Sequence, residues 1–294
     1  MSTVSALSAS PRAAAAADCE EAAMEYLKIM LSYDFIKYAF IVGTMVALCS
    51  SLLGTSLVLR RFSMIGDGLS HVAFGAMAIS AALGAQPTYV ALPIVIVAAF
   101  ILLQVSERGL LSGDSAIALI STSALALGVF VTSVTGSNFD LTSYLFGSIL
   151  AISKSDVVLS SVLCLVVLAL FMFAYNKIFA ITFDESFSKA TGVRTSLYNM
   201  LIAVLTAVTV VIGMRLMGAM LISSFIIFPA LSSMRVCKRF KSVVLLSAVL
   251  SVVSVAAGIL ISCIFDNIPT GAVIVLINLV FFVSMLVIGK IKNR

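Results

Sequence analysis

The only histidine of the chain, His71, follows Asp67 by four residues in the stretch MIGDGLSHVAFG. On a helix both side chains would share one face, about 5–6 Å apart at their Cβ atoms. A carboxylate and an imidazole so placed can bind a transition-metal ion such as Zn²⁺, Mn²⁺ or Fe²⁺, or they can relay a proton. They can also form a structural hydrogen-bonded pair between helices. The spacing alone leaves all three interpretations open.

The surroundings of this pair are almost entirely apolar. The 294 residues are 62% hydrophobic and only 11% charged, whereas soluble domains have about 25% charged residues. Between Arg61 and Glu107 the only charged residue is Asp67. Several such runs approach the ~20 apolar residues that cross a bilayer. An ionised Asp within a span costs about 2.5–3.5 kcal/mol, which favours a functional role for the pair.

Basic residues predict the topology. The net charge of +5 indicates sidedness in a polytopic membrane protein, rather than nucleic-acid binding, because cytoplasmic loops are enriched in Lys and Arg. Five clusters are expected to be cytoplasmic: Arg60-Arg61, Arg108, residues 177–194, residues 235–241 and residues 290–294.

The expected fold is all-α, with eight or nine membrane spans. The expected spans are about 34–59, 63–84, 89–106, 115–135, 155–175, 198–233, 242–264 and 271–289. The run 198–233 would be about 54 Å long as one helix, so it must break near Gly213–Arg215 or Gly218. Arg215 is expected at the outer end of a short helix or paired with an acid. Residues 135–150 are expected to form an outer loop with a short re-entrant or surface helix.

Three regions follow from this topology. Residues 1–33 would be an extracytoplasmic extension ending in an amphipathic lead-in, residues 34–290 the transmembrane domain, and residues 291–294 a cytoplasmic tail. Residues 1–23 lack the basic start and apolar core of a signal peptide, and we expect that they precede the natural start at Met24.

Glycines flank the acid–imidazole pair. Gly66, Gly68 and Gly75 lie in the same predicted span, where each costs about 1 kcal/mol relative to Ala. Small residues let membrane helices approach closely, so we expect these three to serve helix packing.

A short amphipathic helix is predicted within FDESFSKATG, residues 183–192. Asp184 and Glu185 would lie in its first turn, where acids favour the helix dipole, and Gly192 would end it. Phe183, Phe187 and Ala190 would share one apolar face. Such a helix can dock on a partner, or it can be an ordinary cytoplasmic connection.

Missing motifs weigh against an enzyme. The chain has no GxxxxGK[ST] phosphate loop and cannot form HExxH with one histidine. Ser70 and His71 are adjacent, so this spacing does not make them a nucleophile–base pair. The five cysteines are scattered and contain no CxxC. No permanently bound cofactor is therefore expected.

Five stretches together resemble the membrane permeases of bacterial metal-ion ABC importers, which take up zinc, manganese or iron. They are LGTSLVLRRFSMIGDGLSHVAFG, LTSYLFGSIL, FDESFSKATGV, MGAMLISSFIIFPALSS and DNIPTGAVIVL. The resemblance covers about residues 34–290, and its most specific part is the arginine pair followed by G-D-x-L-S-H.

This resemblance implies roles for particular residues. Asp67 and His71 match the positions that line the metal path, and Asp184, Glu185, Ala190 and Gly192 match the coupling helix that docks on the ATPase. The implied architecture is a type II importer in the bacterial cytoplasmic membrane. It would be a homodimer that works with separate ATPase subunits and an extracytoplasmic metal-binding protein, and its mechanism would be alternating access.

The cargo and the mechanism have alternatives. The chain lacks a His-rich loop, and its single Asp and His suit Mn²⁺ or Fe²⁺ as well as Zn²⁺. A proton-coupled secondary metal transporter is the main alternative, although the helix at 183–192 argues against it. An intramembrane enzyme is disfavoured.

Overall fold

The computed structural model describes residues 33–107, 113–136, 147, 152–264 and 268–292. Every regular element in these ranges is a helix, which confirms the all-α prediction. The helices are α2 (Asp34–Leu59), α3 (Ile65–Ala82), α4 (Pro87–Glu107), α5 (Gly113–Thr135), α7 (Lys154–Phe183), α8 (Glu185–Ala190), α9 (Thr195–Met217), α10 (Ala219–Val236), α11 (Phe240–Ile264) and α12 (Thr270–Lys292).

Eight of the described helices are long and apolar enough to cross a membrane, namely α2, α4, α5, α7 and α9–α12. The 18-residue α3, which contains Asp67 and His71, is not among these eight. It nevertheless packs against α4, α5, α9 and α10, and most of its residues are buried. The polar pair thus lies on a helix enclosed by membrane-spanning neighbours.

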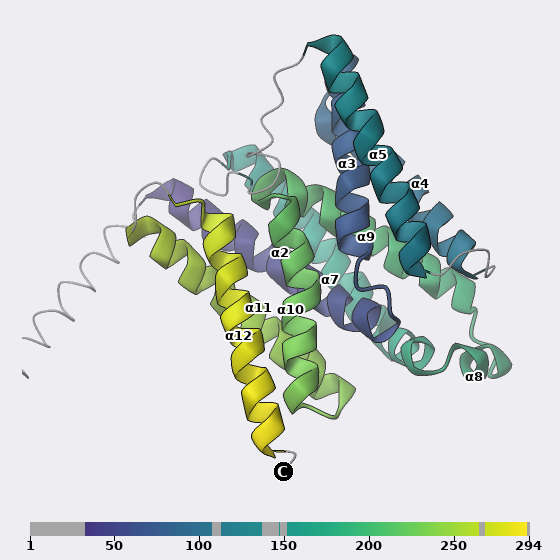
Figure 1. Cartoon of the computed structure of the whole chain (residues 1–294). Helices are drawn as coiled ribbons and strands as arrows, with labels where there is room; N and C mark the ends of the chain where they lie inside the picture. The colour runs from purple at the N-terminus through teal and green to yellow at the C-terminus, as the bar shows by residue number, and fades with distance from the viewer. Residues whose placement is uncertain (1–32, 108–112, 137–146, 148–151, 265–267, 293–294) are drawn as a thin grey trace, which may run out of the picture.

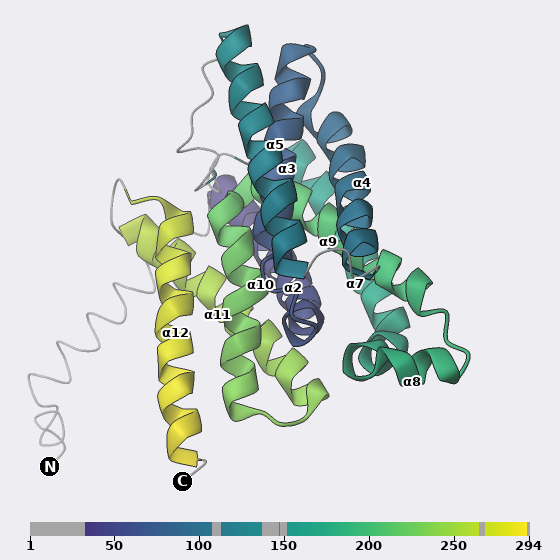
Figure 2. The ribbon, with the colours of Figure 1, turned by 45° about the vertical axis from the view of Figure 1, so that its right-hand side comes forward.

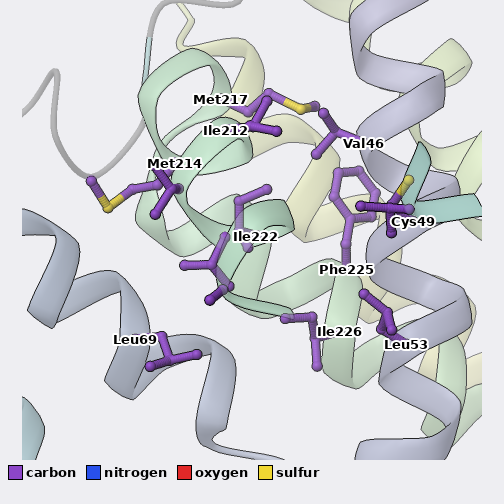
Figure 3. Close-up of a cluster of buried hydrophobic side chains, with 14 of the residues drawn as sticks. Val46, Cys49, Leu53, Leu69, Ile212, Met214, Met217, Ile222, Phe225 and Ile226 are labelled. Atoms are coloured by element: carbon purple, nitrogen blue, oxygen red, sulfur yellow. The ribbon is translucent and has the colours of Figure 1, made fainter. Parts of the chain in front are cut away.

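The helices form two groups joined by a central set. On one side α3 packs on α4 and α5, and on the other α10 packs on α11 and α12, as Figures 1 and 2 show. Helices α2, α7 and α9 connect the groups, with α2 contacting α7, α9, α10 and α11. Figure 3 shows where the groups meet: Leu53 of α2, Met217 of α9 and Phe225 of α10 lie in one buried apolar cluster.

Glycines bring the central helices together. A Cβ at Gly54 of α2 would collide with the carbonyl of Ile226 on α10, and one at Gly213 of α9 would collide with Ile222. Close backbone approach of this kind maximises dispersion contacts where lipid removes the hydrophobic driving force. The contact region of α2, α9 and α10 is therefore tightly packed.

The run 198–233 breaks at Gly218, one of the two predicted positions, and the other, near Gly213–Arg215, lies within α9. Helix α9 ends at Met217 and α10 begins at Ala219, with Gly218 at φ 91° and ψ 158° between them. That region of backbone space is essentially restricted to glycine. The backbone of Gly147 lies against Met217 and Gly218, so this glycine touches the break.

One predicted boundary was wrong. Helix α7 was expected to end near residue 175 but continues to Phe183, about 45 Å in all. Buried Ile178 and Ile181 pack the extension against the protein, and Lys177 is exposed. A single exposed charge does not end a helix whose other face is packed. Most of the extension 1–33 and of the outer loop 135–150 lies outside the described residues.

Basic residues gather at one end of the bundle. Gly289 near the end of α12 contacts Arg235 near the end of α10, and Phe240 at the start of α11 contacts Phe179 and Phe183 near the end of α7. Figure 2 shows α8 and the C-terminus at this same lower end. The distribution of Lys and Arg marks it as the cytoplasmic end.

Candidate functional site

Asp67 and His71 lie one turn apart on the same face of α3. The Nε2 atom of His71 is 3.6 Å from Oδ2 of Asp67. The His71 side chain is 24% exposed and the Asp67 side chain 43% exposed, although their neighbours on α3 are mostly buried. Two potential metal ligands are therefore only partly covered by the described part of the chain.

A third polar side chain comes from α10. The Ser223 hydroxyl donates to Oδ1 of Asp67 at 3.4 Å, and it also lies 3.2 Å from the carbonyl of Ala219 in its own helix. Sequence reasoning missed Ser223 because 156 residues separate it from Asp67. The sequence feature that could have pointed to Ser223 is the polar pair Ser223-Ser224 within an apolar run.

The three glycines near the pair each lie against another helix. A Cβ at Gly66 would be 2.5 Å from Cδ1 of Ile226 on α10. One at Gly68 would be 2.6 Å from Cγ2 of Ile117, and one at Gly75 would be 2.7 Å from the carbonyl oxygen of Ala124, both on α5. Larger residues would push α3 away from these helices and move the acid–imidazole pair with it.

One chain supplies few ligands at this point. Within the described residues no group of three or more His, Cys, Asp or Glu side chains could hold a metal ion. Asp67 and His71 thus give two donors, whereas a closed transition-metal site uses four. The described part of one chain therefore adds no further His, Cys, Asp or Glu donor to this pair.

The predicted amphipathic segment is α8, a separate six-residue helix. The Asp184 side chain caps its start by accepting the Phe187 N–H at 2.8 Å, and Gly192 follows its end at φ 82°. Phe183 and Phe187 are 61% and 65% exposed, and Ala190 is also exposed. The cytoplasmic end therefore presents an uncovered aromatic face.

Glu185 points inward from α8. Its carboxylate lies 3.3 Å from the Arg60 guanidinium and 2.9 Å from Nζ of Lys189, and it accepts from the Asn199 amide at 3.4 Å. Arg60 also donates to Oδ1 of Asn199 at 2.7 Å. The Arg60 side chain is only 11% exposed and Asn199 is buried.

This network connects α8 to the polar pair through a short segment. Arg60 is the residue that ends α2, and the turn after it leads directly into α3. Arg61 in that turn has φ 63°, an uncommon conformation for a residue with a side chain. The Arg60-Arg61 pair reads in the sequence as a topology signal, and no local pattern predicts that Arg60 and Asn199 meet Glu185.

An ion pair fastens the opposite end of the bundle. Arg215 of α9 lies 3.2 Å from the Asp156 carboxylate of α7 and also donates to the Thr88 hydroxyl of α4. The predicted pairing of Arg215 with an acid is confirmed. The network ties three helices together beside the break at Gly218.

Comparison with known proteins identifies a family. Residues 32–289 match the ABC 3 transport family. The high-affinity zinc uptake system membrane protein ZnuB of Buchnera aphidicola is 30% identical over 83% of this chain and 94% of its own length. The manganese transport system membrane protein MntC of Listeria monocytogenes is 27% identical over 91% of this chain and 95% of its own.

A solved structure has the same fold. The chain is similar to PsaBC from Streptococcus pneumoniae, solved in complex with Fab, with a TM-score of 0.78 and 28% identity. The match covers 89% of this chain and 94% of that one. The likeness therefore includes nearly all of the helical bundle.

Proposed function

The chain belongs to the ABC 3 transport family, and we propose that it is the permease subunit of an ATP-driven importer of a divalent transition-metal ion. The observation that supports this most directly is the partly exposed Asp67–His71 pair on α3, a helix packed among four helices that are long and apolar enough to cross a membrane. Relatives named for zinc and for manganese support a metal cargo. Zn²⁺, Mn²⁺ and Fe²⁺ are the candidate ions.

Asp67 and His71 serve as transient metal ligands in this proposal. Two donors bind weakly, and a transport site must release its ion as readily as it accepts it. A second copy of the chain, related by a two-fold axis, would bring two carboxylates and two imidazoles to one passage. The partial exposure of both side chains fits a site that is completed by a partner.

Helix α8 is the proposed coupling helix. Its exposed Phe187 and Ala190, together with Phe183, offer an apolar surface to a separate ATPase subunit. Asp184 and Gly192 define its ends, and Glu185 binds it to Arg60. A shift of α8 on ATP binding would then pull on the α2–α3 turn and on Asp67, which gives alternating access.

The proposed division of the chain keeps the bounds expected from its sequence, although helix α12 itself continues to Lys292. Residues 34–290 form the permease domain, with the extension 1–33 before it and the tail 291–294 after it. An extracytoplasmic metal-binding protein would deliver the ion to the end that carries Arg215. No ATP chemistry is assigned to this chain.

The test is uptake by the full-length permease in proteoliposomes, with its ATPase subunit and metal-binding protein, comparing Zn²⁺, Mn²⁺ and Fe²⁺. His71→Ala should lower uptake by roughly 100-fold or more, since even residues behind metal ligands contribute 10–100-fold. Equilibrium dialysis should find one ion per two permease chains.

The matched control is Met77→Ala, a truncation of similar size on α3 away from the pair, which should retain most uptake. Unchanged uptake by His71→Ala would show that the imidazole is not in the metal path. One bound ion per chain would contradict the dimeric site. Uptake that persists without the ATPase would favour proton-coupled transport instead.

A further inference from the structure

A cavity opens at the cytoplasmic ends of α10, α11 and α12. Its volume is about 500 Å³, within the roughly 300–1,000 Å³ of small-molecule sites. Four cationic side chains line it, from Arg235, Lys238, Arg239 and Lys292, together with Ser242. They come from the end of α10, the α10–α11 connection and the end of α12.

The positive charge of this cavity is uncompensated within the described residues. No acidic side chain lines it, and none of the four cations forms an ion pair there. Elsewhere two described acids pair with cations from other helices: Glu185 with Arg60, and Asp156 with Arg215. Topology requires basic residues on this side but does not require them to converge on one hollow, where they repel each other.

The walls of the cavity are fixed by packing. A Cβ at Gly289 would be 2.6 Å from the carbonyl oxygen of Arg235, so α10 and α12 touch at this level. Phe240 anchors the start of α11 among Tyr175, Phe179 and Phe183 of α7. The cations therefore project from helix ends that are held by contacts with one another and with α7.

An apolar track leaves the cavity along α11. Ser242 is followed at helical spacing by Leu245, Val249 and Val253, which share its face and are 69%, 50% and 44% exposed. These side chains run from the cytoplasmic end into the span. A ligand that fills both features has an anionic phosphate at one end and hydrocarbon at the other.

We propose that this cavity binds the phosphate headgroup of an anionic phospholipid, with its acyl chains along Leu245, Val249 and Val253. Basic pockets between helix ends on the cytoplasmic side suit such headgroups. The bound phosphate offsets the repulsion among the four cations. It also joins the ends of α10, α11 and α12.

The test uses the purified full-length chain in bilayers of phosphatidylcholine with spin-labelled phosphatidylglycerol or spin-labelled phosphatidylcholine. The natural protein should immobilise the anionic label preferentially. Arg239→Gln should weaken that association about 5-fold, and Arg239→Gln with Lys292→Gln about 30-fold, at about 5-fold per cation near the surface. Association of the zwitterionic label should not change.

The control is Lys177→Gln with Lys290→Gln, which removes the same charge from exposed cytoplasmic positions that do not line the cavity. It should retain the preference for phosphatidylglycerol. If both double variants lose the preference for phosphatidylglycerol equally, that preference comes from general attraction to a basic surface, and the proposed site is overturned. Displacement of the anionic label by excess inorganic phosphate would identify a soluble phosphate as the occupant and overturn the lipid assignment, whereas no displacement supports the lipid.

Discussion

At the scale of single residues, polar side chains gather within the apolar helix bundle, where burying a polar group costs free energy. Asp67 and His71 lie on α3, and Ser223 reaches Asp67 from α10 at 3.4 Å. The hydroxyl contacts one carboxylate oxygen, while the imidazole lies near the other. Ser223 therefore positions the carboxylate and links its orientation to the position of α10.

Ser223→Ala should reduce metal uptake moderately, by about 5-fold, because a single hydrogen bond contributes about 1 kcal/mol. The effect should appear as weaker metal affinity, measured by uptake at a series of ion concentrations. Ser232→Ala is the control, since the Ser232 hydroxyl donates to the carbonyl of Phe228 in the same helix. Equal behaviour of the two variants would exclude a positioning role for Ser223.

At the scale of the element, α8 is attached to the bundle by charge rather than by a large apolar contact. Its carboxylate, from Glu185, meets Arg60 at the end of α2 and Asn199 near the start of α9. A hydrogen-bonded charged pair with one side chain 11% exposed is a more rigid connection than a solvent-exposed pair. This connection is the route by which we propose that a movement of α8 reaches the turn that precedes α3.

Arg60→Gln should uncouple transport from ATP hydrolysis while leaving the ATPase bound. The number of metal ions transported per ATP hydrolysed should fall by roughly 10-fold. This is the lower end of what the loss of a hydrogen bond to a charged group costs, about 1.5–3 kcal/mol. The ratio is measured in proteoliposomes from simultaneous uptake and phosphate release.

Lys189→Gln is the matched control for that variant. Lys189 also contacts Glu185, at 2.9 Å, but its side chain is 62% exposed, and exposed pairs contribute about 0–1 kcal/mol. Its transport ratio should stay near that of the natural protein. If Arg60→Gln keeps a normal ratio as well, the proposed connection between α8 and α3 fails.

At the scale of the whole molecule, the two ends of the bundle differ in charge and in exposed surface. At the end with Arg215 and Asp156, an ion pair joins α9 to α7. The cytoplasmic end presents α8, with its aromatic face, and the cationic cavity. The family match and the eight apolar helices identify a multi-pass protein of the bacterial cytoplasmic membrane, and confirm the resemblance to metal-importer permeases.

Phe187→Asp should lower the amount of ATPase subunit that co-purifies by at least about 10-fold. The reason is that the new charge would be buried in an apolar contact. Pull-down of the full-length permease from membranes measures this. The adjacent exposed Ser186→Asp introduces the same charge outside the aromatic face and should retain the ATPase. Retention by both variants would place the docking surface elsewhere.

Particular elements show how far the sequence could be interpreted. The spans at α2, α5 and α12 could be predicted because uninterrupted apolar runs need no tertiary information. That the run 198–233 must break followed from its length, since 36 residues exceed the bilayer, but the structure decided for Gly218 over Gly213–Arg215. The extension of α7 to Phe183 did not follow, because its stability comes from packing of Ile178 and Ile181 that local composition does not reveal.

The amino-acid sequence by itself determined the membrane class, the helix order, and the presence of one acid and one imidazole on one helix face. These depend on hydropathy and on the 3.6-residue period, which are local properties. Only the tertiary structure decided that Ser223 meets Asp67, that Arg60 and Asn199 meet Glu185, and that cations from three segments line one cavity. Those contacts join residues far apart in the chain, and packing between helices brings them together.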